Sequence, residues 1–174
     1  MRFQGAAYRA HDPRWAFAPL AGDGAAIYGG RYNRKGVPAL YLALDAITAV
    51  REITQGLARK FDPCVLCSYD IDCEPVADLR RDAGRARHHV KLSDMRCSWF
   101  LEAAADADPA SWRIADRLIA EGYAGLLTPS FAPGATSDAH NLVLWKWSAN
   151  LPTKVAVYDP SSKLPKDQRS WPRS

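Results

Sequence analysis

The chain has 174 residues, of which 48% are hydrophobic and 24% are charged, as in an ordinary soluble globular protein. Its net charge of +4 is too small to indicate nucleic-acid binding, so we expect no direct nucleic-acid contact. No apolar run approaches the roughly 20 residues that span a bilayer, and the N-terminus lacks a signal-like apolar segment. These features predict a cytoplasmic protein without membrane contact, with one domain over residues 1–160 and a polar tail over residues 161–174.

The first half of the chain contains two predicted strands and a helix. Residues 6–10 form the first strand, and residues 27–33 (IYGGRYN) are punctuated by glycine and predicted to be strand-like at their end. The apolar run at residues 39–44 is typical of a buried strand. Asp45 follows it as the N-cap of a helix over residues 46–58. The apolar face of this helix is expected to comprise Ile47, Val50, Ile53 and Leu57.

The second half mixes strands with short helices. Residues 64–72 are predicted to form a strand, and residues 76–108 a loop with one or two short helices. Asp108 and Pro109 suit the N-cap and first position of a helix that ends at Gly122. Further strands are expected at 123–130, 141–147 and 154–159. Without a regular alternation of strand and helix, the pattern predicts an α+β fold with a mostly antiparallel or mixed sheet.

The cysteines could indicate a metal site, because Cys64 and Cys67 form a CxxC pair. A zinc clamp needs both thiolates on one side, usually at a turn, whereas the surrounding residues have the pattern of a strand. Period-2 geometry then places the two cysteines on opposite faces. We therefore expect buried, reduced thiols and no metal.

A glycine pair followed by an arginine is the first candidate for a binding site. Gly29 and Gly30 allow the backbone to approach a ligand closely. Arg31 offers a planar, permanently charged fork that suits phosphate. Tyr32 and Tyr41 add flat faces that carry a hydroxyl group. The alternative is a hairpin whose arginine pairs with a surface carboxylate.

Glu52 and Ser137 are the other candidates. Glu52 lies on the flank of the predicted helix, and a strand-to-helix connection could bring it back beside Tyr41; the alternative is a solvated glutamate. Ser137 lies in a small, polar loop directly before an apolar strand, where loops often carry function. The alternative for Ser137 is a turn in which side chains only satisfy backbone groups.

Several other enzyme classes fit the sequence poorly. Ser137 is not part of a GxSxG elbow, and His140 is too near it in sequence to be a convincing base. A ribonuclease could use the basic stretch 80–91 with His88 and His89, but interleaved aromatic residues are missing there. Neither a P-loop nor a dinucleotide-binding glycine fingerprint occurs.

The order YRA, GGRYN, PALYLA, Glu52, a serine in a small polar loop and NLVLWKW resembles the RES domain, over residues 8–158. That family is named for an arginine, a glutamate and a serine, and the matching positions are Arg31, Glu52 and Ser137. The resemblance implies a fold similar to ADP-ribosyltransferases, with a small split mixed or antiparallel β-sheet flanked by helices. It also implies NAD as the substrate.

The resemblance further implies a toxin of a toxin–antitoxin pair. Such a toxin would cleave the nicotinamide–ribose bond of NAD and transfer ADP-ribose to a metabolic protein such as phosphoribosyl pyrophosphate synthetase. An NAD glycohydrolase or phosphorylase is the alternative, and a ribonuclease toxin or a non-catalytic nucleotide-binding module is a further one. The implied partner is an Xre-like helix-turn-helix antitoxin that covers the active site.

The site residues take specific roles in this hypothesis. Glu52 would stabilise the positive charge that grows on the ribose, and Arg31 would hold a phosphate or a ribose oxygen. Tyr41, together with Tyr32, would stack on the nicotinamide or ribose. Ser137 would orient Glu52 or the dinucleotide. Gly30 would let the chain close on the substrate, and no metal is required.

Overall fold

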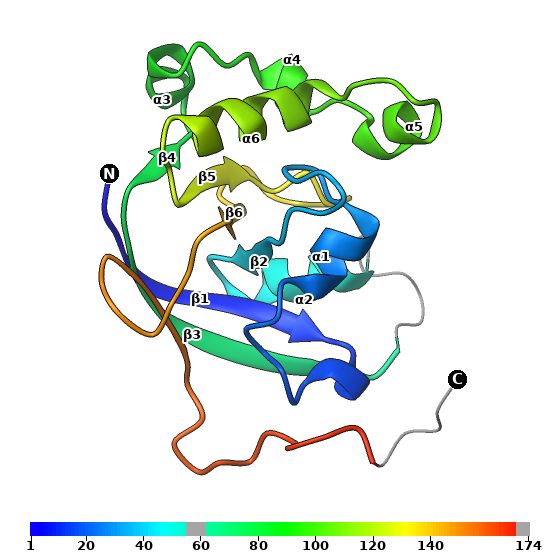
Figure 1. Ribbon diagram of the computed structural model, residues 1–174, viewed down its shortest axis with the longest axis vertical. Coiled ribbons are helices and arrows are strands. Elements are labelled where there is room, and N and C mark those ends of the chain that lie inside the picture. The colour runs from blue at the N-terminus through cyan, green and yellow to red at the C-terminus, as the bar shows by residue number, and fades with distance from the viewer. Residues whose placement is uncertain (55–61, 170–174) are drawn as a thin grey trace.

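A computed structural model describes residues 1–54 and 62–169, which form one seven-stranded sheet with helices packed around it (Figure 1). The strand order is β4-β5-β6-β2-β1-β3-β7. Only β4 and β5 are parallel, and every other neighbouring pair is antiparallel. The strands are β1 (Phe3–His11), β2 (Leu40–Ala43), β3 (Val65–Cys73), β4 (Val76–Asp78), β5 (Gly125–Pro129), β6 (His140–Leu144) and β7 (Thr153–Val157). The predicted α+β class with a mixed sheet is confirmed.

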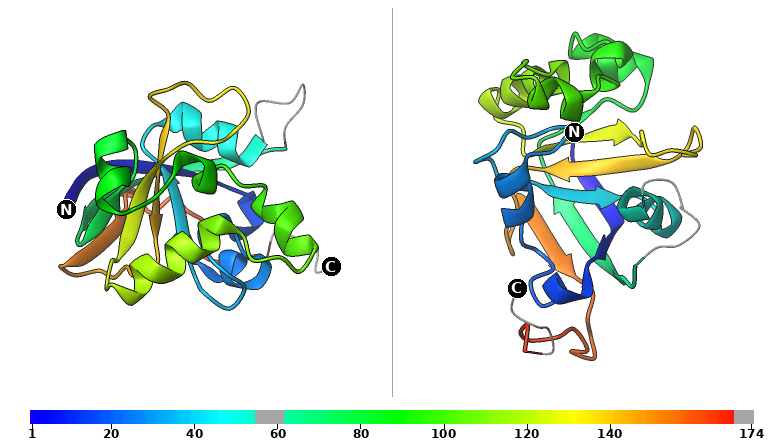
Figure 2. Two further views of the ribbon diagram at one scale, coloured as in Figure 1. Left: turned by 90° about the horizontal axis from the view of Figure 1, so that it is seen from above. Right: turned by 90° about the vertical axis from the view of Figure 1, so that its right-hand side faces the viewer.

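The sheet is split between β1 and β2. β1 pairs with β3 along its whole length, but its register with β2 contains only Tyr8 opposite Ala43. The two halves, β1-β3-β7 and β4-β5-β6-β2, therefore diverge beyond this pair, as Figure 2 shows. A split of this kind opens a gap in which side chains of both halves can meet.

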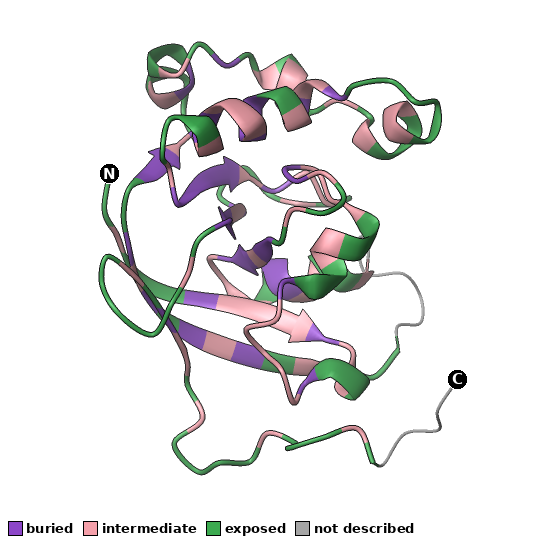
Figure 3. Cartoon of the chain, viewed as in Figure 1, coloured by how far each residue is buried: buried purple, intermediate pink, exposed green. Residues whose placement is uncertain are grey.

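A layer of helices covers the outer half of the sheet. Its members are α3 (Asp82–Arg87), α4 (Leu92–Met95), α5 (Trp99–Ala104) and α6 (Ala110–Ala120), which lie above β4, β5 and β6 in Figure 1. Leu118 and Met95 from this layer pack with Leu126 of β5 in one buried cluster. A second cluster, including Leu42, Tyr69 and Leu142, fills the other face of the sheet. The buried residues in Figure 3 are accordingly divided between the strands and the helices and loops that pack on them.

The remaining helices are η1 (Pro13–Trp15), α1 (Asp23–Tyr28) and α2 (Ala46–Thr54). Residues 55–58, also predicted to be helical, lie outside the described ranges. Asp45 caps α2 as predicted: its carboxylate accepts hydrogen bonds from the backbone N–H and the hydroxyl of Thr48, at 2.8 and 2.6 Å. Within residues 1–54 and 62–169, no helix has the length and apolar character needed to cross a membrane.

Three local predictions are wrong. Residues 27–33 are not strand-like but comprise the end of α1 and a tight turn, because Gly29 adopts φ +76° and ψ 173°, a conformation nearly restricted to glycine. The N-cap of α6 is Pro109 rather than Asp108. The short strand β4 was not predicted. Gly122, with φ +87°, ends α6 as expected.

The predicted apolar face of α2 is also wrong. Ile47 is 63% exposed and Ile53 is 41% exposed, whereas the buried residues of the described helix are Thr48 and Ala49. Small side chains let the helix lie close to the split sheet, and the capping bonds to Asp45 satisfy the Thr48 hydroxyl. The face that carries Ala49 and Glu52 is thereby turned toward the gap.

All four cysteines lie within the described ranges and none forms a disulfide. Cys67 and Cys73 are buried, as predicted, while Cys64 and Cys97 are only half-buried. Among the described residues beyond β7, where the segment was expected to be loosely held, Leu164 packs against the apolar cluster around Leu42 and Tyr69. The Asp159 carboxylate accepts backbone N–H bonds from Lys163 and Leu164 and so shapes the turn before that contact.

Candidate active site

Glu52 lies at the opening of the split sheet, where two side chains hold its carboxylate. The Ser130 hydroxyl and the Asn141 amide both donate hydrogen bonds to Oε1, each at 2.6 Å. The other oxygen, Oε2, accepts no hydrogen bond from the described residues. Glu52 is exposed to solvent. The carboxylate is therefore fixed through one oxygen and open to a ligand through the other.

The serine that contacts Glu52 is Ser130, not the predicted Ser137. The Ser130 hydroxyl accepts a hydrogen bond from the Ala132 N–H at 3.2 Å, so its own proton is directed at the carboxylate. Ser130 follows β5 directly and is held by a bond from its N–H to the Ala139 carbonyl. Ser137 lies exposed farther along the same loop and does not line the cleft described below. The pairing register of β5 with β6, rather than the composition of the loop between them, decides which serine reaches Glu52.

Arg31 is anchored on one side and open on the other. Its Nη1 donates to the carbonyls of Met95 and Cys97, both at 2.9 Å. The guanidinium lies over the ring of Phe131, 5.0 Å from the centroid. Of the five N–H donors of a guanidinium, the anchoring contacts use those on Nη1. The remaining donors can bind an anion in a fixed orientation.

Tyr41 and Tyr32 are less available for stacking than predicted. The Tyr41 hydroxyl donates to Asn33 Oδ1 at 2.8 Å and accepts from the Tyr32 N–H at 2.9 Å. Tyr32 is buried in the core with its hydroxyl 3.0 Å from Thr128 Oγ1. Burial raises the pKa of both phenols, so both remain neutral. Tyr41 lines both hollows of the cleft described below, whereas Tyr32 lines only the larger one, with its hydroxyl turned into the core.

The Tyr41 side chain leaves no room for a Cβ atom at Gly30. A Cβ at Gly30 would stand 2.5 Å from the Tyr41 hydroxyl and 2.6 Å from Asn33 Oδ1. The Gly30 carbonyl also accepts a hydrogen bond from Trp112 Nε1 at 2.8 Å, which joins the turn to α6. The glycine therefore makes room for Tyr41, and it also lines the larger hollow described below, so its close approach to a ligand stays a prediction.

Gly30→Ala is expected to destabilise the protein by about 1–3 kcal/mol, because the methyl group displaces the Tyr41 hydroxyl and its two hydrogen bonds. Gly24→Ala is the matched control: nothing lies within 4 Å of a Cβ there, and alanine favours the helix α1. Urea unfolding of both variants measures the difference. Equal stability of the two variants would contradict the close packing at Gly30.

Arg9 is a site residue that the sequence did not single out. It lies on β1 beside the split, half-buried, with Nη1 donating to the Ala21 carbonyl at 3.1 Å. Burial lowers the pKa of Arg9, and an arginine remains charged nonetheless. Arginine is rarely buried, so an arginine within a strand of small and aromatic residues is unusual. This was the signal in the sequence that could have identified Arg9.

These residues surround a cleft made of two adjoining hollows. The smaller hollow, of about 280 Å³, lies among β1, β2 and α2. The larger hollow, of about 590 Å³, lies among α1, α5 and the loop between β5 and β6. The residues that line both hollows are Arg9, Tyr41, Glu52 and Asn141. Asn141 Oδ1 is buried without a hydrogen-bond partner in the part of the chain that is described, so this acceptor beside the carboxylate is unsatisfied.

The geometry suits an anionic substrate that develops positive charge at one carbon. Two guanidinium groups can hold phosphates, and an oriented carboxylate can face a cationic centre. His88 and His89, the candidate ribonuclease residues, lie between α3 and α4 and do not line this cleft. His140 does not line it either.

Ser130→Ala is expected to lower turnover at this site roughly tenfold, since a hydrogen bond to a charged group that fixes its orientation is lost. Ser137→Ala, in the same loop, should retain the wild-type rate. Steady-state kinetics with NAD, the substrate that the family resemblance implies, compares the two variants. A lower rate in Ser137→Ala than in Ser130→Ala would indicate that Ser137 orients the carboxylate instead.

Comparison with known proteins adds the following. The sequence model described as RES domain matches residues 6–167 of the chain. No curated protein matches it. A chain in the crystal structure of the M. tuberculosis MbcT–MbcA toxin–antitoxin complex is similar with a TM-score of 0.60 and 20% sequence identity. That match covers 91% of this chain and 84% of the other.

Proposed function

The chain belongs to the RES domain family, and from that premise we propose that it is the toxin of a toxin–antitoxin pair and acts on NAD. The observation that carries the proposal is Glu52, held by Ser130 and Asn141 in a cleft that also contains Arg9 and Arg31. The larger hollow, of about 590 Å³, is within the range of small-molecule sites, roughly 300–1,000 Å³, and the smaller hollow, of about 280 Å³, adjoins it.

The proposed reaction breaks the bond between C1′ of the ribose and the nicotinamide nitrogen. Nicotinamide leaves as a neutral molecule with the bonding electrons, and positive charge grows on the ribose as in glycoside hydrolysis. Glu52, whose Oε2 is open, stabilises this charge more than it stabilises the ground state. Arg31 holds the pyrophosphate and so fixes the position of C1′.

The acceptor is proposed to be a protein side chain, which attacks C1′ and loses a proton, so that the products are ADP-ribosylated protein and nicotinamide. A metabolic enzyme such as phosphoribosyl pyrophosphate synthetase is the proposed acceptor. The exposure of Glu52 supports an open site, but it equally favours water or phosphate as acceptor. In that alternative the protein is an NAD glycohydrolase or phosphorylase.

The proposed partner is an antitoxin of the Xre type that covers the cleft. Large exposed apolar side chains close in sequence to Tyr28 and Trp99, which line the larger hollow, support such a contact, since contiguous exposed apolar surface commonly marks an interface. They are Ile27 of α1 and Phe100 and Leu101 of α5, each more than 60% exposed.

The proposal is tested by incubating the purified chain with NAD labelled on the adenylate, with and without cell lysate. A discrete labelled protein band is expected, and free nicotinamide should appear with it. Free ADP-ribose, or its phosphorylated form, without a labelled band would favour the glycohydrolase or phosphorylase. Intact NAD in both samples would contradict the proposed function.

A further inference from the structure

The two hollows meet at Glu52, and this arrangement assigns the two halves of a dinucleotide. We propose that the smaller hollow holds nicotinamide and the larger hollow holds the adenosine half, with adenine stacked on Tyr28 and Trp99. This inference rests on the proposed function, because it takes NAD as the ligand.

The position of the Glu52 carboxylate determines which part of the dinucleotide lies in which hollow. Glu52 lines both hollows, and the carbon whose bond breaks must lie beside it. The two parts of the substrate joined at that carbon then extend in opposite directions. One part is a single ring, and the other contains two riboses, a pyrophosphate and a double-ring base. The smaller part therefore suits the hollow of about 280 Å³, and the larger part suits the hollow of about 590 Å³.

The linings agree with this division. The smaller hollow is walled by the apolar residues Leu42, Ala43 and Ala49, which suit a ring that leaves uncharged. Arg31 lines only the larger hollow, where its open N–H donors can reach the pyrophosphate. Arg9 lines both hollows and so places a second cation at their junction.

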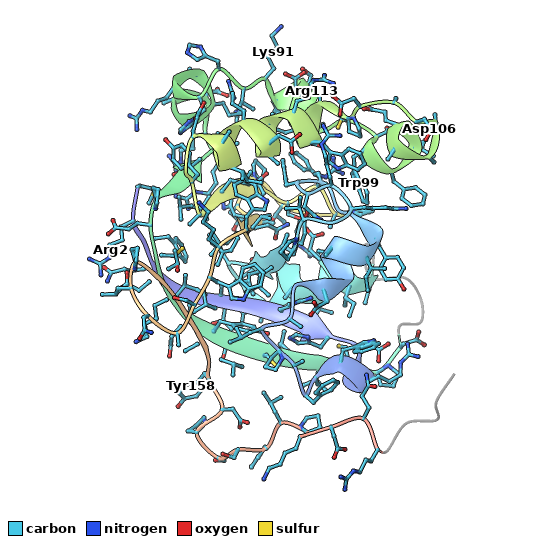
Figure 4. The ribbon with its side chains drawn as sticks, viewed as in Figure 1. Arg2, Lys91, Trp99, Asp106, Arg113 and Tyr158 are labelled. Atoms are coloured by element: carbon cyan, nitrogen blue, oxygen red, sulfur yellow. The ribbon has the colours of Figure 1, made fainter. Side chains whose placement is uncertain are left out.

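The outer end of the larger hollow presents two aromatic rings. Tyr28 ends α1 and is 75% exposed, and Trp99 begins α5 and is half-buried. Both line the larger hollow and neither lines the smaller. Figure 4 shows Trp99 below α5, toward the body of the molecule, and Figure 1 shows α1 below α5 on the same side.

These rings have faces available for a base. Neither side chain forms a hydrogen bond with any residue in the ranges 1–54 and 62–169, and Trp99 packs edge-to-face with Phe100, with centroids 5.7 Å apart. An exposed aromatic ring in a cleft is a sequence-tolerant platform for nucleobases. A second arginine is not needed at this end, since adenosine is uncharged.

The test measures the two halves separately by calorimetry, with AMP and nicotinamide as probes of the full chain. Trp99→Ala and Tyr28→Ala are each expected to weaken AMP binding roughly tenfold and to leave nicotinamide binding unchanged. The matched control is Tyr158→Ala, which removes an aromatic ring that is 64% exposed and lines neither hollow, and which should bind both probes as the wild type does. The KM for NAD should rise in the two former variants, with kcat largely kept.

The outcomes separate this inference from the proposed function. Weakened nicotinamide binding with unchanged AMP binding would reverse the assignment of the hollows. Unchanged binding of both probes, or equal losses in Tyr158→Ala, would overturn the role of the two rings. Tyr28, being largely exposed, carries the test if Trp99→Ala does not fold. A wild type that binds AMP but leaves NAD intact would contradict the proposed function instead.

Discussion

Glu52→Gln is expected to lower the kcat for NAD about a hundredfold or more, with little change in KM. The amide oxygen of glutamine can still accept the hydrogen bonds from Ser130 and Asn141, so the side chain keeps its place. Only the negative charge that faces the growing positive charge on the ribose is lost. Removing one such preorganised group typically costs about 3 kcal/mol of transition-state stabilisation. Chromatographic measurement of nicotinamide release gives both constants.

Glu121→Gln provides the control for this substitution. Glu121 follows α6 and does not line the cleft, so its variant should turn over NAD at the wild-type rate. Full activity of Glu52→Gln would show that the negative charge of Glu52 takes no part in the reaction. The reading as a nucleotide-binding module would then gain support, provided that NAD still binds.

The stability of the protein is expected to fall as the pH drops below about 6.5, because of His11. This histidine is buried, and its Nε2 lies 2.6 Å from the Tyr69 hydroxyl, which donates to the Pro19 carbonyl. Burial, with a smaller contribution from the Arg9 charge, lowers the pKa of His11 from 6.5 to about 4. The folded chain therefore keeps His11 neutral at a pH where the unfolded chain protonates it.

The direction follows from proton linkage. Between pH 6.5 and about 4 the unfolded state binds more protons than the folded state at this position, so the free energy of unfolding rises with pH. The contribution is complete above pH 6.5, and roughly 3 kcal/mol is lost once the pH has fallen through the folded pKa. Carboxylates such as Asp78, whose pKa is lowered by the hydrogen bond from Arg80, act in the same direction at lower pH.

Urea unfolding between about pH 7.5 and pH 5 measures this contribution. His11→Gln should show a flatter dependence of the free energy of unfolding on pH, because the titrating group is gone. His89→Gln replaces an exposed histidine and should leave the wild-type slope. Parallel slopes for wild type and His11→Gln would show that His11 does not titrate differently in the two states.

Local patterns predicted the elements that frame the site. The buried strand β2, the Asp45 cap and the helix α2 are adjacent in sequence, and each depends on interactions over a few residues. The glycine at the end of α6 was predicted for the same reason, since a left-handed residue favours glycine wherever it occurs. Glu52 could be placed beside Tyr41 because one connection joins their elements.

The choice between Ser130 and Ser137 could not be made in this way. Both are serines in or next to one loop, and only the pairing of β5 with β6 brings the end of β5 beside Asn141 and thus beside Glu52. Arg9 was not identified because its importance depends on where β1 separates from β2, a strand that begins only at Leu40. The burial of Ala49 instead of Ile47 has the same origin.

The sequence by itself determined the α+β class, the order of most elements and the candidates Arg31, Tyr41 and Glu52, because propensity, capping and short spacings are properties of neighbouring residues. Only the tertiary structure decided which serine holds the carboxylate, which second arginine lines the cleft and that the cleft has two parts. Those features arise from a sheet that stays paired along β1 and β3 but opens after Tyr8 and Ala43. The register between distant strands is a property of the whole fold, so no local pattern contains it.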